Sequence, residues 1–231
     1  MAAKPRNYRI IVHENPRSPI SESYRMLRTN IQFTSIDRPV KSILVTSPEP
    51  GAGKSTTSAN LAATFAQEGK KVVLIDADMR NPTLHYYFMK SNRTGLSNAL
   101  AGQTPVQQCL LDTYIENLVL LPSGSIPPNP AEILSSNRMI GLLDELYAQF
   151  DIVIVDSPPV MAVTDAQVLS ARCCGTLLVL QAGRVKRQLA QKTIERLRYV
   201  NANLLGVVLN KVQSKRNDGI YPYYYGSHRS S

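Results

Sequence analysis

Residues 42–56 read SILVTSPEPGAGKST, an apolar run followed by a glycine-containing loop that ends in Gly-Lys-Ser-Thr. A helical pattern continues to residue 67, so the stretch predicts a strand, a loop and a helix in succession. Glycines let the backbone wrap closely around phosphate oxygens, while successive N–H groups and the helix N-terminus face the anion. Lys54 adds a positive charge near the β- and γ-phosphates, and the Ser55 hydroxyl is a ligand for Mg²⁺. The stretch therefore predicts a phosphate-binding loop of the P-loop type.

Apolar runs of strand length recur along the chain, with helix-length segments between them. The runs are nearly continuous in Val, Ile and Leu, which is typical of parallel strands buried on both faces. They cover residues 42–46, 72–75, 118–121, 152–155, 176–180 and 204–209, and the helical segments cover 21–33, 55–67, 131–149, 165–171 and 187–201. This alternation predicts right-handed βαβ units. The expected fold is α/β: a doubly wound, mostly parallel sheet flanked by helices, of the P-loop NTPase type.

Three aspartates follow apolar runs of this kind. Asp76 ends the second run and Asp78 comes two residues later, while Asp156 ends the fourth run. Ligands of open parallel sheets bind at the carboxyl ends of the strands. A lone aspartate there is commonly a helix cap, but three beside a phosphate loop indicate direct or water-mediated Mg²⁺ coordination. They also indicate acceptance of a proton from an attacking hydroxyl.

The composition is that of one globular α/β domain, with 231 residues, 43% of them hydrophobic and 19% charged. No apolar run approaches the roughly 18 residues of a membrane span. The N-terminus lacks the apolar segment of a secretory signal, so a cytoplasmic protein is expected. Cys109, Cys173 and Cys174 form no C-x-x-C pair, which predicts buried thiols in a reducing compartment rather than disulfides or a zinc site.

The formal net charge of +9 is concentrated at the two ends of the chain. Such ends either remain solvated or meet acidic lipid, nucleic acid or an acidic protein surface. Direct nucleic-acid binding is not expected, because it needs base-stacking aromatic residues among the basic ones, and the tail offers only a weak version of that pattern. Residues 1–213 are expected to form one domain. Residues 214–231 are expected to form a mobile tail with tyrosines at four positions, Tyr221, Tyr223, Tyr224 and Tyr225.

The helical segment over residues 21–33, capped by Ser18 or Ser21, carries Glu22, Arg25 and Arg28. Three-residue spacing places these charges along one helix face. Spacing alone favours an exposed ion pair within the helix. A charge-assisted contact with an acidic surface on a neighbouring molecule is the alternative.

These motifs resemble the MinD/ParA-like branch of P-loop proteins and, within it, the bacterial tyrosine kinases of the CpsD/CapB type. The resemblance covers about residues 21–225. The second nucleotide motif of that family, Asp-x-Asp-x-Arg after an apolar run, is matched by Asp76, Asp78 and Arg80. Its third motif, Asp-x-Pro-Pro, is matched by residues 156–159. Glu22-x-x-Arg25-x-x-Arg28 is similar to the ring-forming motif of these kinases, and the tyrosine-rich tail is similar to their autophosphorylation cluster, although it could also be an interaction tail.

The resemblance implies ATP as phosphoryl donor, with Mg²⁺ as its metal ion. The implied nucleotide contacts are Pro50, Gly51, Ala52, Gly53, Lys54, Ser55, Thr56 and Arg80, with Asn210 after the last strand reading the adenine. The implied metal ligands, direct or through water, are Ser55, Asp76, Asp78 and Asp156. Lys54 and the three aspartates carry catalysis. Either Asp76 or Asp78 accepts the tyrosine proton, with Asp76 preferred.

The resemblance also implies how the kinase is assembled and controlled. It implies a homo-oligomeric ring, an octamer, in which the tail of one subunit enters the site of the next. Phosphorylation of other proteins on tyrosine is implied as well, and so is a separate transmembrane adaptor that activates the kinase and recruits it to the inner face of the membrane. The implied process is the control of capsule or exopolysaccharide production.

Two positions in the loop depart from common patterns. Pro48 replaces the usual first glycine of a P-loop, and Glu49 stands where ParA- and MinD-type ATPases carry a lysine that reaches across a dimer. Glu49 and the tyrosine tail disfavour a partition or membrane-associated ATPase, which is the main alternative and predicts no phosphotyrosine. A non-catalytic nucleotide-binding scaffold is the second alternative. The intact Lys54, Ser55 and three aspartates disfavour it.

Overall fold

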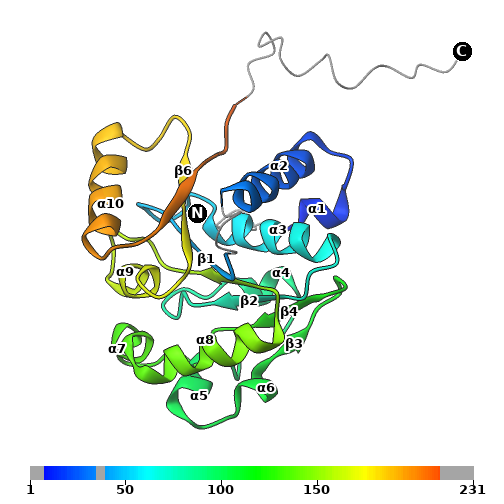
Figure 1. Cartoon of the computed structure of the whole chain (residues 1–231), viewed down its shortest axis with the longest axis vertical. Helices are drawn as coiled ribbons and strands as arrows, with labels where there is room; N and C mark the ends of the chain where they lie inside the picture. The colour runs from blue at the N-terminus through cyan, green and yellow to red at the C-terminus, as the bar shows by residue number, and fades with distance from the viewer. Residues whose placement is uncertain (1–7, 35–39, 214–231) are drawn as a thin grey trace, which may run out of the picture.

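The computed structural model describes residues 8–34 and 40–213, which form a three-layer α/β arrangement (Figure 1). Seven strands form one sheet in the order β3-β4-β2-β5-β1-β6-β7. All neighbouring strands are parallel except β3, which pairs antiparallel with β4. The strands are β1 (Ser42–Thr46), β2 (Val72–Asp76), β3 (Leu111–Asp112), β4 (Leu118–Leu121), β5 (Ile152–Asp156), β6 (Gly175–Gln181) and β7 (Leu204–Asn210). The predicted doubly wound, mostly parallel sheet is confirmed.

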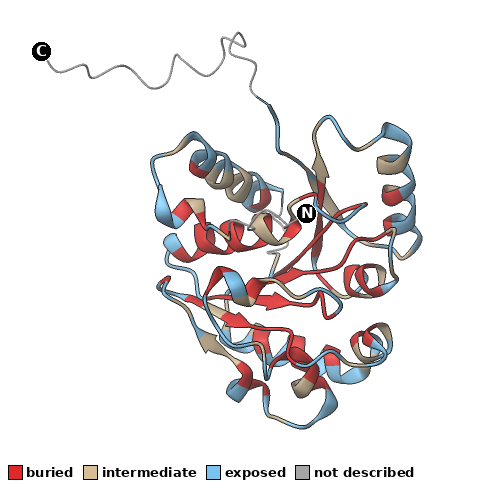
Figure 2. Ribbon diagram, turned by 180° about the vertical axis from the view of Figure 1, so that it is seen from behind, coloured by how far each residue is buried: buried red, intermediate tan, exposed pale blue. Residues whose placement is uncertain are grey.

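Helices cover both faces of this sheet. One face carries α1 (Ile11–Glu14), α2 (Pro19–Phe33), α3 (Lys54–Gln67) and α4 (Leu84–Tyr87). The other carries α5 (Leu96–Ala101), α6 (Val106–Cys109), α7 (Pro130–Ser135), α8 (Asn137–Gln149), α9 (Asp165–Ser170) and α10 (Arg187–Tyr199). Successive residues of the central strands alternate between the two cores. In β1, for example, Ile43 and Val45 pack on the α3 side and Leu44 on the α8 side. The uninterrupted apolar runs reflect this burial on both faces (Figure 2).

The last strand departs from that expectation. β7 lies at the edge of the sheet, and its residues are only partly buried or exposed, with Leu209 62% exposed and Val207 45% exposed. The apolar run over residues 204–209 correctly predicts a strand, but its burial on both faces was wrong. The apolar pattern predicts that these residues form a strand, whereas the position of the strand in the sheet decides how much of its side-chain surface is buried.

Two helix predictions are refined. The segment 131–149 is not one helix, because Ser136 adopts an extended backbone conformation (ψ 158°) that separates α7 from α8. Ser18 is the N-cap of α2 and accepts a hydrogen bond from the Ser21 backbone N–H at 3.1 Å, while Pro19 occupies the first turn. The short elements α1, α4, α5, α6 and β3 lacked a sequence signal long enough to predict them.

No helix in the described part of the chain combines the length and apolar character needed to cross a membrane. The tail tyrosines Tyr221, Tyr223, Tyr224 and Tyr225 lie outside the described residues. The predicted boundary at residue 214 therefore stays a prediction.

Candidate nucleotide and catalytic site

The phosphate loop joins the carboxyl end of β1 to the N-terminus of α3, as the sequence predicts. Gly51 and Gly53 both adopt positive φ angles, 80° and 97°, which glycine tolerates without strain. The predicted contacts from Pro50 to Thr56 are thereby gathered around one turn and the first residues of α3. Lys54 is the first residue of that helix and is almost fully buried.

The sheet brings two of the predicted aspartates side by side. Asp76 and Asp156 are paired residues of neighbouring strands β2 and β5, and both are fully buried at the carboxyl ends of those strands. Asp156 accepts hydrogen bonds from the Ser55 hydroxyl and, at 3.1 Å, from the Ser58 hydroxyl. The third-motif carboxylate is therefore fixed directly to the phosphate-loop helix. Sequence analysis missed Ser58, although its position one helical turn after Lys54 could have indicated it.

Backbone groups fix the second-motif carboxylates. One oxygen of Asp76 accepts the N–H groups of Thr83 and Leu84, each at 2.9 Å, and the other accepts the Asp78 N–H at 3.3 Å. Asp78 accepts the Asn81 N–H at 3.1 Å, and its other oxygen lies 3.9 Å from Lys54 Nζ. The loop after β2 thus holds both oxygens of Asp76 through backbone N–H groups and places Asp78 beside the phosphate-loop lysine.

Crowding of buried carboxylates raises their affinity for protons. Burial, and then the charge of Asp156, hold the pKa of Asp76 well above its ordinary value. Burial raises the pKa of Asp156 to about 6, although Lys54 and the Ser55 hydroxyl oppose that rise. Burial also raises the pKa of Asp78, again against the charge of Lys54. A cation among these groups would therefore be strongly favoured.

The donor chemistry suits a magnesium nucleotide. Within the described residues, no three His, Cys, Asp or Glu side chains gather as a metal-holding group by themselves. Mg²⁺ commonly takes one or two protein oxygens and completes its shell with water and substrate phosphates. Ser55 and Asp156 supply such oxygens, and Lys54 supplies the neighbouring positive charge. These residues fit ATP with Mg²⁺.

The predicted nucleotide contact Arg80 forms an ion pair with an aspartate of α9. Its guanidinium donates two hydrogen bonds to the carboxylate of Asp165, at 3.0 and 3.1 Å, and that carboxylate is fully buried at the start of α9. This pair joins the loop after β2 to the helix after β5. Nothing in the sequence around Asp165 indicated the contact, because the two residues are 85 positions apart.

Two further contacts adjoin the phosphate loop. Asn210, at the end of β7, donates from Nδ2 to the Ala52 carbonyl at 2.8 Å. The Tyr87 hydroxyl, at the end of α4, lies 2.7 Å from the Thr56 hydroxyl, and burial raises the pKa of Tyr87 to about 12. Tyr87 was not predicted, since a tyrosine in a short apolar segment reads as part of the core.

The predicted oligomerisation residues contact their own subunit. Arg25 donates to Glu22 at 2.9 Å and to the Pro16 carbonyl at 2.6 Å. Arg28 donates to the Thr64 carbonyl of α3 at 3.0 Å and lies 3.8 Å from Glu68. The ion pair within the helix is present, and its role in assembly stays a prediction.

The cysteines partly depart from expectation. None forms a disulfide, and Cys109 and Cys173 are buried as predicted. Cys174 is exposed, so its predicted burial was wrong. It precedes β6 at the rim of the sheet, where a helix no longer covers the chain.

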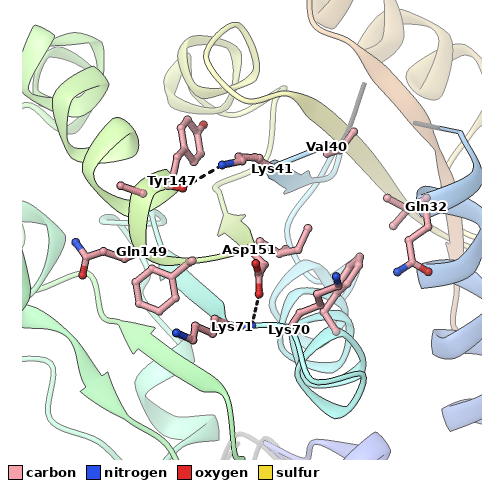
Figure 3. Close-up of a pocket in the computed structure, with 13 residues that line it drawn as sticks. Gln32, Val40, Lys41, Lys70, Lys71, Tyr147, Gln149 and Asp151 are labelled. Carbon is pink, nitrogen blue, oxygen red and sulfur yellow. Dashed lines mark hydrogen bonds between the residues drawn. The ribbon is translucent and has the colours of Figure 1, made fainter. Parts of the chain in front are cut away.

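A pocket of about 640 Å³ lies at the amino ends of the central strands, at the other end of these strands from the phosphate loop (Figure 3). Lys41, Lys71 and Asp151 come just before β1, β2 and β5 there, and Lys41 Nζ donates to the Tyr147 carbonyl at 3.2 Å. The helices α2, α3 and α8 end around this pocket, and cations are favourable beside helix C-termini. The position of Lys41 is therefore explained by the C-terminus of α8, and no phosphate-loop residue lines the pocket.

Comparison with known proteins agrees with this geometry. The family described as "AAA domain" matches residues 40–203. Tyrosine-protein kinase YwqD of Bacillus subtilis (strain 168) is 46% identical over 216 residues, which is 93% of this chain and 90% of the relative.

Solved structures give the same result. The chimerical protein CapA2B2 superposes with a TM-score of 0.86 at 44% identity, covering 89% of this chain and 90% of that one. The kinase domain of the Escherichia coli tyrosine kinase ETK superposes with a TM-score of 0.87 at 33% identity, covering 98% and 89%. The cell division ATPase MinD of Pyrococcus furiosus, at 24% identity and a TM-score of 0.63 over 73% and 71%, shares the fold alone. The chain therefore belongs to the bacterial tyrosine-protein kinases, enzymes built on the P-loop ATPase fold.

Proposed function

We propose that this kinase binds ATP with Mg²⁺ at the loop before α3 and phosphorylates the tail tyrosines of a neighbouring copy. The observation that carries the proposal is the joint burial of Lys54, Asp76 and Asp156 at the carboxyl ends of β1, β2 and β5. Three charged side chains buried together near the carboxyl ends of the strands lower the stability of the fold unless they face an ion or a reacting group.

Each residue has a distinct role in this proposal. ATP supplies the phosphoryl group, and Mg²⁺ neutralises charge on it. Lys54 stabilises the charge that develops on the transferred group. Ser55 and Asp156 hold the metal, since their oxygens already meet in a hydrogen bond. Asp78, 3.9 Å from Lys54 Nζ, orients that lysine and reaches the metal directly or through water.

Asp76 accepts the proton of the attacking phenol. Burial, and then the charge of Asp156, raise its pKa, so Asp76 in its ionised form has a strong affinity for a proton. Asp78 is the weaker candidate, because the positive charge of Lys54 lowers its proton affinity. Asp76 is fully buried, so in this proposal the phenol approaches it after the residues around it have rearranged.

The wider biological role rests on the family resemblance. The tyrosines that receive the phosphate are Tyr221, Tyr223, Tyr224 and Tyr225. Subunits assemble into an octameric ring through Glu22, Arg25 and Arg28. A separate transmembrane adaptor activates the kinase and recruits it from the cytoplasm to the inner face of the membrane. Phosphorylation brings about −1.5 to −2 charges per tyrosine. It loosens the ring and thereby controls the production of capsule or exopolysaccharide.

The test is a phosphotyrosine immunoblot with intact-mass analysis after incubation with Mg-ATP. Wild type is compared with Lys54→Met and with a variant in which all four tail tyrosines are Phe. We expect mass gains of one or more phosphates in wild type, none in Lys54→Met and fewer in the tail variant. ATP hydrolysis without phosphotyrosine, even with an adaptor's cytoplasmic segment added, would instead support a MinD/ParA-like ATPase.

Mixing a variant that lacks the catalytic lysine with one that lacks the tail tyrosines tests transfer between copies. Lys54→Met, which keeps its tail, is incubated with the tail variant, which keeps its site. Phosphotyrosine on the Lys54→Met chain requires transfer from one molecule to another. Its absence, while wild type is phosphorylated, would mean that each subunit phosphorylates its own tail.

A further inference from the structure

The end of β7 is fastened to the outside of the phosphate loop by two neighbouring side chains. Asn210 Nδ2 donates to the Ala52 carbonyl at 2.8 Å, and Lys211 Nζ donates to the Gly51 carbonyl at 2.7 Å. β7, which is drawn in orange in Figure 1, is the edge strand of the sheet and pairs with β6. Residues from opposite ends of the described chain therefore meet at consecutive peptide groups of the loop.

These two carbonyls determine where the adjoining N–H groups point. In a trans peptide, the carbonyl oxygen and the N–H of the next residue point in opposite directions. Holding the carbonyls of Gly51 and Ala52 towards β7 directs the N–H groups of Ala52 and Gly53 away from it. Neither N–H has an acceptor elsewhere in residues 8–34 and 40–213. Unpaired N–H groups in succession form the concave anion site of a phosphate loop.

The local backbone keeps the two donors in this arrangement. The Lys211 N–H donates to Asn210 Oδ1 at 2.8 Å, so the amide of Asn210 must present its Nδ2 to the loop. Lys211 adopts φ 58°, a left-handed conformation that is unfavourable for lysine and persists only where surrounding contacts impose it. A Cβ on Gly53 would lie 2.0 Å from Asn210 Nδ2, which shows how closely Asn210 packs on the loop.

We propose that Asn210 and Lys211 are positioning residues that pre-organise the phosphate loop, so that two of its N–H groups face the nucleotide phosphates before binding. The inference rests on the nucleotide-binding function proposed above. It assigns Asn210 a phosphate-directed role, in place of the adenine contact that the resemblance implies. It also gives Lys211 a role that no sequence motif indicated.

The two roles of Asn210 predict different losses. An adenine contact affects ligands that carry adenine and leaves the binding of a bare polyphosphate unchanged. A loop-positioning contact weakens ATP and tripolyphosphate by the same factor, because both ligands use the same N–H groups. Calorimetric titration of the full chain with Mg-ATP and with Mg-tripolyphosphate separates the two readings.

The variants are Asn210→Asp, Lys211→Met and Lys211→Arg, with Lys192→Met on the exposed face of α10 as the matched control. Asp is nearly isosteric with Asn but lacks the donor to Ala52. The negative charge that it adds repels the phosphates of both ligands alike, so the ratio of the two losses decides between the roles. We expect Lys211→Met to raise Kd about three- to tenfold for both ligands, the size of one net hydrogen bond at an exposed site. Lys211→Arg should restore affinity, and Asn210→Asp should weaken both ligands at least as much. Unfolding midpoints without ligand should match wild type for the Lys211 variants.

Several results would overturn the inference. One is that Asn210→Asp weakens Mg-ATP by a much larger factor than Mg-tripolyphosphate, which would restore the adenine role. Another is that Lys211→Met binds both ligands as tightly as the control variant Lys192→Met does. Should Asn210→Asp fail to fold, the comparison at Lys211 decides alone. A wild-type protein that bound neither ligand would overturn the nucleotide-binding function and the inference together.

Discussion

The ion pair between Arg80 and Asp165 should make a measurable contribution to stability, because one of its partners cannot reach water. Asp165 is fully buried, Arg80 is 39% exposed, and two hydrogen bonds join them. In the described part of the chain, Asp165 has no other hydrogen-bond donor. Arg80→Met would leave a buried carboxylate without its partner. In a fully buried pair this lowers the free energy of unfolding by about 3–5 kcal/mol. Because Arg80 is partly solvated, we expect a loss of about 2 kcal/mol here. For a chain of this size that corresponds to a Tm lower by about 4–8 °C.

A double-mutant cycle isolates the pair. Asp165→Asn removes the charge and should recover at least half of the loss when it is added to Arg80→Met. Free energies of unfolding come from urea titrations followed by circular dichroism. Glu22→Gln is the control, because Glu22 and Arg25 meet at a similar distance, 2.9 Å, but Glu22 is 51% exposed. It should cost less than about 0.5 kcal/mol. If Arg80→Met lowered the free energy of unfolding no more than Glu22→Gln does, the argument that burial sets the strength of an ion pair would be refuted.

Three further predictions follow from the site and its surroundings. Gly53→Ala should weaken nucleotide binding more than Gly51→Ala. The positive φ angle opposes a side chain at both positions, but only a Cβ at Gly53 would displace Asn210 from the loop, whereas a Cβ at Gly51 meets nothing within 4 Å. Equal affinities in calorimetry would contradict this. The raised pKa of Asp156 implies that protonation stabilises the metal-free fold, so this contribution is full below pH 3.8 and is lost as pH rises through about 6. Asp156→Asn should therefore gain stability relative to wild type more at pH 7.5 than at pH 5, measured by thermal unfolding without metal, and a pH-independent difference would count against it. Tyr147→Phe should cost about 1 kcal/mol, because the Tyr147 hydroxyl bonds Ser42 Oγ at 2.8 Å, and a urea midpoint equal to wild type would exclude that contribution.

Much of the sheet could be predicted because its signal is local. A fully covered parallel strand must be apolar at every position, so the strands β1, β2, β4 and β5 stand out as continuous runs. The short elements could not be predicted in this way, since four-residue helices such as α4 contain too few residues for periodicity. The break at Ser136 escaped prediction because the segment keeps an apolar pattern on both sides of it.

The candidate site shows the same difference between local motifs and long-range contacts. The chemistry of Lys54, Ser55, Asp76 and Asp156 could be predicted, because their motifs follow strands whose carboxyl ends meet at one edge of the sheet. Contacts between residues far apart in sequence could not. The nucleotide contact of Arg80 stays a prediction, but no local pattern indicated its ion pair with the buried Asp165. Nor did any local pattern indicate that Lys211 lies beside Gly51.

The sequence by itself determined the α/β class, the phosphate loop, its acidic partners and the resemblance to bacterial tyrosine kinases. Each of these depends on residue types at fixed spacing within one short segment. Only the tertiary structure decided which charges are buried together, which strand is left at the edge, and which side chains hold the loop in shape. Those properties depend on strand order, and strand order arises from packing among segments that no local pattern places relative to one another.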